Sequence, residues 1–230
     1  ADDLARIVAA RYDEAAERIH AATSDGTLLR GEVLARWQDF VGTSDVFRTI
    51  EGWLSRTRDR IGAFLQGRPA PVVQVETAIE HGLHAVVVDE AGGAAGDAWQ
   101  RVRATQAGRW LTAGVDLSRE GDDLAERTSR LVRDWQAALV RRISDQAGDK
   151  RVRARILSLG LNAVTVTLMV IVFASTGGLT GGELAIAGGS AIVGQKLLET
   201  IFGEEAVRRM ARDARADLDE RVRALLAEEA

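Results

Sequence analysis

The sequence predicts an all-α protein, an elongated bundle of long antiparallel helices that includes a glycine-rich apolar helical hairpin. Ala, Arg, Leu, Val, Asp and Glu dominate the 230 residues, with only two prolines, and this balance favours helix over sheet. Apolar residues recur at spacings of three and four over most of the chain, which is typical of amphipathic helices. A third observation predicts the hairpin: no residue from Ile156 to Gly182 is charged, although 28% of the chain is.

Residues 1–68 are expected to form an N-terminal helical segment. The spacing predicts one helix from Asp3 to about Ala22, a second with Leu29, Val33, Trp37, Phe40 and Val41 on one face, and a third from Val46 to Leu65. The proline-rich stretch GRPAP follows as the one firm break in the chain. We therefore expect a subdomain boundary there.

Residues 72–155 are expected to form central long helices, and residues 203–230 a C-terminal amphipathic helix. From Val72 to Val88 a helix is favoured, although VVQV and AVVV also fit a strand locally, and EAGGAAGDA is weakly helical and fits a kink or loop. A long helix is expected to start near Ser118. Its apolar stripe comprises Leu124, Leu131, Trp135, Leu139 and Ile143. Core packing is expected for the tryptophans at 37, 53, 99, 110 and 135.

The sequence predicts no catalysis, cofactor or metal. A phosphate loop needs Lys directly after its second glycine, but Gly182 is followed by Glu183, and Lys196 comes one place late after Gly194. Glu80, His81 and His84 have spacing that suits a zinc site, yet a solvated helix face explains them more simply. There is no cysteine, which excludes disulfides and thiolate chemistry.

Residues 156–202 are the predicted paddle-like hairpin. Ile156–Ser175 would span about 30 Å as one helix, TGGLTGG would form the turn, and Leu184–Phe202 would be a second arm rich in small residues. A two-pass crossing would draw Lys196 and Glu199 toward the bilayer centre, which is costly. Two interpretations therefore stay open: a hairpin sheltered inside protein, or one whose tip enters a single leaflet.

In the second interpretation two groups of residues contact lipid. The apolar group is Leu168, Met169, Ile171, Phe173, Leu179, Leu184 and Ile186. The basic group, here called the collar, is Arg141, Arg142, Lys150, Arg151, Arg153 and Arg155, just before the apolar arm. A basic cluster beside an apolar segment is attracted to anionic lipid, although these cations would equally pair with acids on a neighbouring helix.

Two blocks of the sequence resemble a known family. SLGLNAVTVTLMVIVFASTGGLTGGELAIAGGSAIVGQKLLETIFGEEAVRRMARDARADLDERV resembles the C-terminal part of large actinobacterial dynamin-like GTPases, and LLRGEVLARWQDFVGTSDVF resembles the helical region after their GTPase domain. The resemblance implies a helical stalk with a membrane-directed paddle, and a GTPase domain elsewhere in the full-length protein. It further implies a cytoplasmic protein at the inner face of the plasma membrane.

The leading functional hypothesis is a non-catalytic stalk that couples the motion of a GTPase domain to membrane binding or remodelling. Its expected partners are anionic membrane lipids and, through the long helices, further copies of the chain, with no nucleic acid. A soluble scaffold with the hairpin as permanent core is the alternative. A pore-forming helical protein that inserts its hairpin is the weaker alternative.

Overall fold

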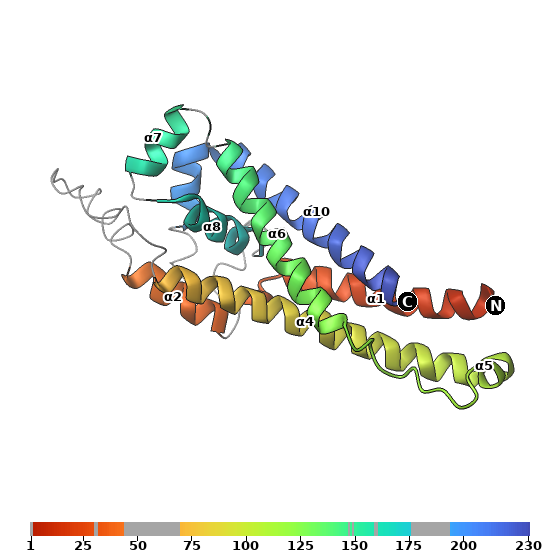
Figure 1. Ribbon diagram of the computed structural model, residues 1–230. Coiled ribbons are helices and arrows are strands. Elements are labelled where there is room, and N and C mark those ends of the chain that lie inside the picture. The colour runs from red at the N-terminus through yellow and green to blue at the C-terminus, as the bar shows by residue number, and fades with distance from the viewer. Residues whose placement is uncertain are drawn as a thin grey trace. The chain divides into compact units, whose positions relative to one another are not determined.

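The computed structural model describes residues 2–29, 32–43, 70–146, 148, 150–158, 161–175 and 194–230. Within these ranges the chain is an all-α bundle of packed helices without strands (Figure 1), which confirms the predicted fold class. The expected helix from Val46 to Leu65, the TGGLTGG turn and the first part of the second hairpin arm lie outside the described residues.

The chain divides into two compact units. Unit 1 comprises Ala1–Thr23, Glu80–Asp134 and Ala216–Ala230, and unit 2 comprises Ser24–Ile79 and Trp135–Arg215. Each unit joins segments that are far apart in the sequence, so contacts between helices hold it together. The four-segment division made from the sequence stays a prediction.

Unit 1 is built from most of α1 (Asp2–Ser24) and from parts of α4 (Ala70–Ala104), α6 (Leu124–Gln146) and α10 (Glu204–Glu229). Each helix contributes one apolar stripe to the core, as an amphipathic helix should. The buried side chains include Tyr12 and Ile19 of α1, Leu83 and Val87 of α4, Leu124 and Val132 of α6, and Leu218, Val222 and Leu226 of α10.

Helix α4 runs unbroken through EAGGAAGDA, so the expectation of a kink or loop there was wrong. Two of the glycines, Gly92 and Gly96, lie beside the chain that leads into α6. A Cβ at Gly92 would lie 2.8 Å from a carboxylate oxygen of Glu120, and one at Gly96 would lie 3.7 Å from the carbonyl oxygen of Ser118. The chain that returns toward α6 therefore passes directly over the small-residue face of α4.

The expected start of the next long helix near Ser118 was also wrong, because α6 begins at Leu124. Residues 112–123 form turns and extended chain. Before them, Thr105 ends α4 and caps the short helix α5 (Gln106–Leu111), its hydroxyl accepting a hydrogen bond from the Gly108 amide at 2.9 Å. Figure 1 shows α5 at the C-terminal end of α4.

Unit 2 contains the 3₁₀ turn η1 (Thr27–Leu29), α2 (Glu32–Thr43), α7 (Lys150–Ser158), α8 (Ala163–Ser175), a helix over residues 194–202, and the remaining parts of α4, α6 and α10. Trp37 is buried against Phe40, with ring centres 5.6 Å apart. A Cβ at Gly194 would lie 3.1 Å from the Trp37 ring, so a larger residue there would displace the indole.

The expected apolar stripes are largely confirmed. In the C-terminal helix all six expected residues are buried: Val207, Met210, Ala214, Leu218, Val222 and Leu225. In α6, Leu124, Trp135, Leu139 and Ile143 are buried, while Val132 takes the core position expected for Leu131. The expectation of a core role was wrong for Trp110, which is 80% exposed.

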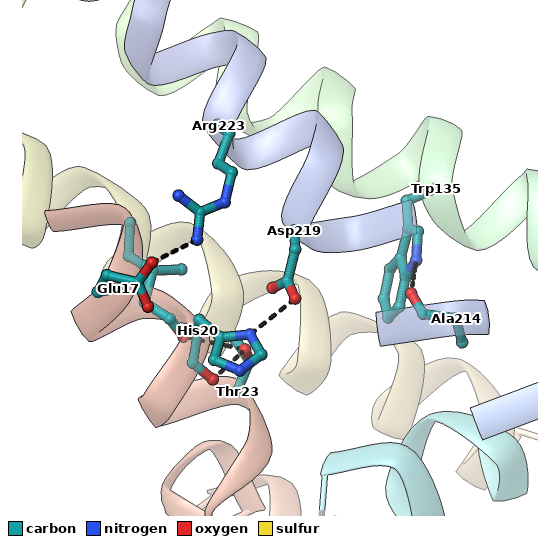
Figure 2. A network of polar contacts seen from close by, with 8 residues as sticks. Glu17, His20, Thr23, Trp135, Ala214, Asp219 and Arg223 are labelled. Carbon is teal, nitrogen blue, oxygen red and sulfur yellow. Dashed lines mark hydrogen bonds and ion pairs between the residues drawn. The ribbon is translucent and has the colours of Figure 1, made fainter. Parts of the chain in front are cut away.

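Replacing Trp135 by Phe should lower the free energy of unfolding by about 1–2 kcal/mol. The buried indole N–H of Trp135 donates to the carbonyl oxygen of Ala214 at 3.0 Å and so ties α6 to α10 within unit 2 (Figure 2). Urea unfolding followed by circular dichroism measures the change. Trp110→Phe is the control and should shift stability by less than about 0.5 kcal/mol; equal effects of the two variants would contradict the assigned role of Trp135.

Candidate functional site

Helix α8 is the most apolar element of the described chain and the centre of the candidate site. Every residue from Thr165 to Ser175 is buried, including Ile171 at 1% exposure. A helix that is hydrophobic on all sides has no face for water, so it is stable only inside protein or inside lipid. In this structure protein supplies the shelter, as one of the two interpretations from the sequence proposed.

The first hairpin arm is not one helix, which corrects the expected span from Ile156 to Ser175. It is divided into α7 and α8, and Asn162 begins the second piece. The Asn162 side-chain oxygen accepts a hydrogen bond from the Thr165 amide at 2.9 Å, and its carbonyl oxygen accepts one from Val166 at 3.1 Å. Asparagine is among the best N-cap residues, and these two hydrogen bonds satisfy amides in the first turn of α8.

Several polar groups of α8 form hydrogen bonds inside the protein. The hydroxyls of Thr167 and Ser175 donate to the carbonyls of Ala163 and Ile171 at 2.7 and 2.9 Å. The carbonyl oxygen of Ser175, in the last turn of the helix, accepts a hydrogen bond from the Gly26 amide at 2.8 Å. Gly26 has φ of +84°, a value that glycine adopts without strain. The turn before η1 thus completes the C-terminal end of α8.

The residues expected to face lipid divide into two groups. Leu168, Met169, Ile171 and Phe173 are all buried in α8. Leu179, Leu184 and Ile186 lie outside the described residues. In the part of the chain that the structure describes, no helix combines the length and the apolar character needed to traverse a bilayer.

The collar lies at the surface. Its six side chains are exposed, two near the end of α6 and four on the nine-residue helix α7. Arg155 also donates to the carbonyl oxygen of Ile201 at 3.2 Å, which ties α7 to the helix over 194–202. Helix α7 contains no acidic residue, while Ile156 is buried. It therefore combines an apolar anchor with an exposed basic face.

The possible zinc set from the sequence does not form a site. Glu80 instead accepts a hydrogen bond from Arg133 at 3.0 Å, and His81 is exposed. Over the described ranges, no group of three or more His, Asp or Glu residues is arranged to hold a metal ion.

A polar network in unit 1 joins α1 to α10 (Figure 2). Arg223 donates to Glu17 at 2.6 Å, and His20 Nδ1 lies 2.7 Å from Asp219 Oδ2. The hydrogen bond and charge of Arg223 lower the pKa of Glu17, and the same hydrogen bond raises the pKa of Arg223. Sequence reasoning missed this network because its partners are about 200 positions apart, and local patterns carry no signal for such pairs.

Tyr12 of α1 lies near Glu229, the last residue of α10. It is buried, and burial raises the pKa of its phenol, with smaller contributions in the same direction from the carboxylates of Glu229 and Glu120. Glu229 is held in place by Arg127 at 3.1 Å and by the Gly121 amide. The C-terminal turn of α10 is thereby linked to the chain that leads into α6.

No family model, curated protein or solved structure matches this chain.

Replacing Ile171 by Asp should destabilise unit 2 by several kcal/mol, because the new carboxylate would be buried without a partner. Thermal unfolding followed by circular dichroism measures the loss. Thr200→Asp places the same carboxylate on an exposed face of the same unit and should change stability little. An Ile171→Asp protein as stable as the control would contradict the burial of α8.

The Tyr12 phenol should titrate above its ordinary pKa of about 10 in the folded protein. A raised folded-state pKa adds stability that is complete below pH of about 10 and is lost as the pH rises through the folded value. Because Tyr12 is the only tyrosine, tyrosinate absorbance at 295 nm reports it alone. Glu229→Gln should lower the midpoint and Tyr12→Phe should remove the transition; a native midpoint at or below the midpoint in urea would refute this expectation.

Proposed function

We propose that this chain is a non-catalytic helical module that binds an anionic membrane surface through the collar, and that it serves as the stalk of a dynamin-like GTPase. The observation that carries the membrane part is the exposure of all six collar side chains directly before the apolar helix α8. The stalk assignment rests on the sequence resemblance described above. In this proposal the protein acts at the cytoplasmic face of the plasma membrane.

The collar has the character of a lipid-headgroup contact. A juxtamembrane Lys or Arg contributes about 1 kcal/mol of attraction to an anionic surface. Four of the six cations lie on α7, whose apolar residue Ile156 is buried in unit 2. Because the buried Ile156 fixes α7 to unit 2, the four cations of this helix are exposed on one short segment of the surface. Helix α8 stays sheltered in this state and would reach lipid only after a rearrangement that uncovers it.

A soluble scaffold is the second candidate, and the complete burial of α8 favours it. The hydroxyls of Thr167 and Ser175 and the carbonyl oxygen of Ser175 are hydrogen-bonded within the protein, which is typical of a permanent core. In a scaffold, the collar would serve only solubility or contacts with acidic protein surfaces. The two candidates therefore differ in whether the collar responds to lipid.

The chain should float with vesicles that contain anionic lipid and not with neutral vesicles. Replacing Lys150 and Arg153 by Gln removes two collar charges and should weaken partitioning about 30-fold, at about 1 kcal/mol for each charge. Raising the salt concentration should also weaken the binding of the wild-type protein to anionic vesicles, because salt screens the attraction between charges. Dye release from the same vesicles would mark the pore-forming alternative.

Replacing Arg208 and Arg212 by Gln is the matched control, since these residues are exposed cations of α10 in the same unit. The control should bind like wild type. Equal binding to neutral and anionic vesicles, or equal losses in the two double variants, would refute the collar as the contact and favour the scaffold.

A further inference from the structure

The segment around α5 exposes more large apolar surface than any other described part of the chain. Trp110 is 80% exposed, Leu111 70%, Val115 53% and Leu117 60%. We call these four side chains the α5 corner. They fall within eight consecutive residues of unit 1, and Val73 is the one other large apolar residue exposed in the described ranges. Clustered exposed apolar side chains mark interaction surfaces, whereas single ones do not.

The exposure is built into the local structure. A Cβ at Gly108 would collide with the carbonyl oxygen of Val102, so α5 folds back tightly on the end of α4. Arg109 donates to the carbonyls of Arg103 and Ala104 at 3.1 and 3.0 Å, which satisfies the last turn of α4. Gly114, with φ of +84°, then turns the chain. Helix α5 is therefore held in place with Trp110 and Leu111 directed outward.

The charges beside the corner match a negatively charged surface. Four exposed arginines lie between residues 101 and 119: Arg101, Arg103, Arg109 and Arg119. One acid, Asp116, lies in the same span, and it accepts a hydrogen bond from the Ser118 amide at 3.0 Å. This hydrogen bonding with Ser118 lowers the pKa of Asp116. Residues 101–119 thus combine four exposed arginines and one aspartate with the four apolar side chains of the α5 corner, before Glu120, Asp122 and Asp123 follow.

We propose that the α5 corner is a second lipid contact, which inserts Trp110 and Leu111 into the headgroup region of an anionic membrane. Tryptophan concentrates at this interface because its ring is amphipathic, and the flanking arginines pair with lipid phosphates. A second copy of the chain fits less well, because one side of a standard protein interface contains about 20–30 residues. The proposal shares its partner class with the proposed function but rests on different residues.

The chain has no cysteine, so a fluorophore can be attached at a single introduced cysteine to test this proposal. Ala113→Cys, labelled with an environment-sensitive fluorophore, reports the exposed centre of the corner. Ala154→Cys reports the collar, and Ala216→Cys reports an exposed position on α10 of unit 1. On addition of vesicles with anionic lipid, the probe at 113 should shift to the blue and brighten, and the probe at 216 should not change.

Replacing both Trp110 and Leu111 by Ser should weaken binding measured at position 113 about tenfold or more, with an unchanged circular dichroism spectrum because both residues are exposed. Arg101→Gln with Arg119→Gln should weaken it about 30-fold without removing apolar surface. These two variants test the apolar and the charged part of the contact separately.

The responses of the probes at positions 113 and 154 distinguish the α5 corner from the collar. A response at 154 without one at 113 overturns the α5 corner and leaves the collar proposal standing. A response at 113 without one at 154 supports the corner and refutes the collar. A change at 113 that depends on protein concentration in the absence of vesicles overturns the lipid assignment in favour of contact between copies.

Discussion

The burial of α8 is the constraint on which the rest of unit 2 depends. Eleven consecutive residues of this helix have no exposed face, so the unit must surround them. The Asn162 cap separates α8 from the charged helix α7, and the Gly26 amide completes its last turn. These hydrogen bonds help a helix without any charged residue to lie inside a protein in which 28% of the residues are charged.

The burial of α8 also places this helix and the collar before it in opposite environments. Apolar residues of α8 are withdrawn from solvent, while the cations that precede them are presented at the surface. Apolar side chains that remain exposed gather instead at the α5 corner in unit 1. In the described residues, the two surfaces proposed to contact anionic lipid are thus the collar in unit 2 and the α5 corner in unit 1.

Charge pairs join the helices of unit 1 to one another. Glu17 with Arg223, Arg18 with Glu90, and Arg133 with Glu80 each join two different helices of the unit. Pairs of this kind at a surface contribute at most about 1 kcal/mol each. Their value lies in fixing which faces of the helices meet over a core that includes small residues such as Ala15, Ala91 and Ala94.

The sequence by itself determined the helical class, the stripe of the C-terminal helix and the exceptional character of the 156–175 segment, because these follow from composition and local spacing. It did not determine that α4 continues as one helix through glycines 92 and 96, nor that Trp110 faces solvent while Trp37 and Trp135 are buried. Local patterns describe one helix at a time. Only the tertiary structure decides which neighbour covers a given face, and that decision placed Leu168, Met169, Ile171 and Phe173 inside the protein and left the α5 corner outside.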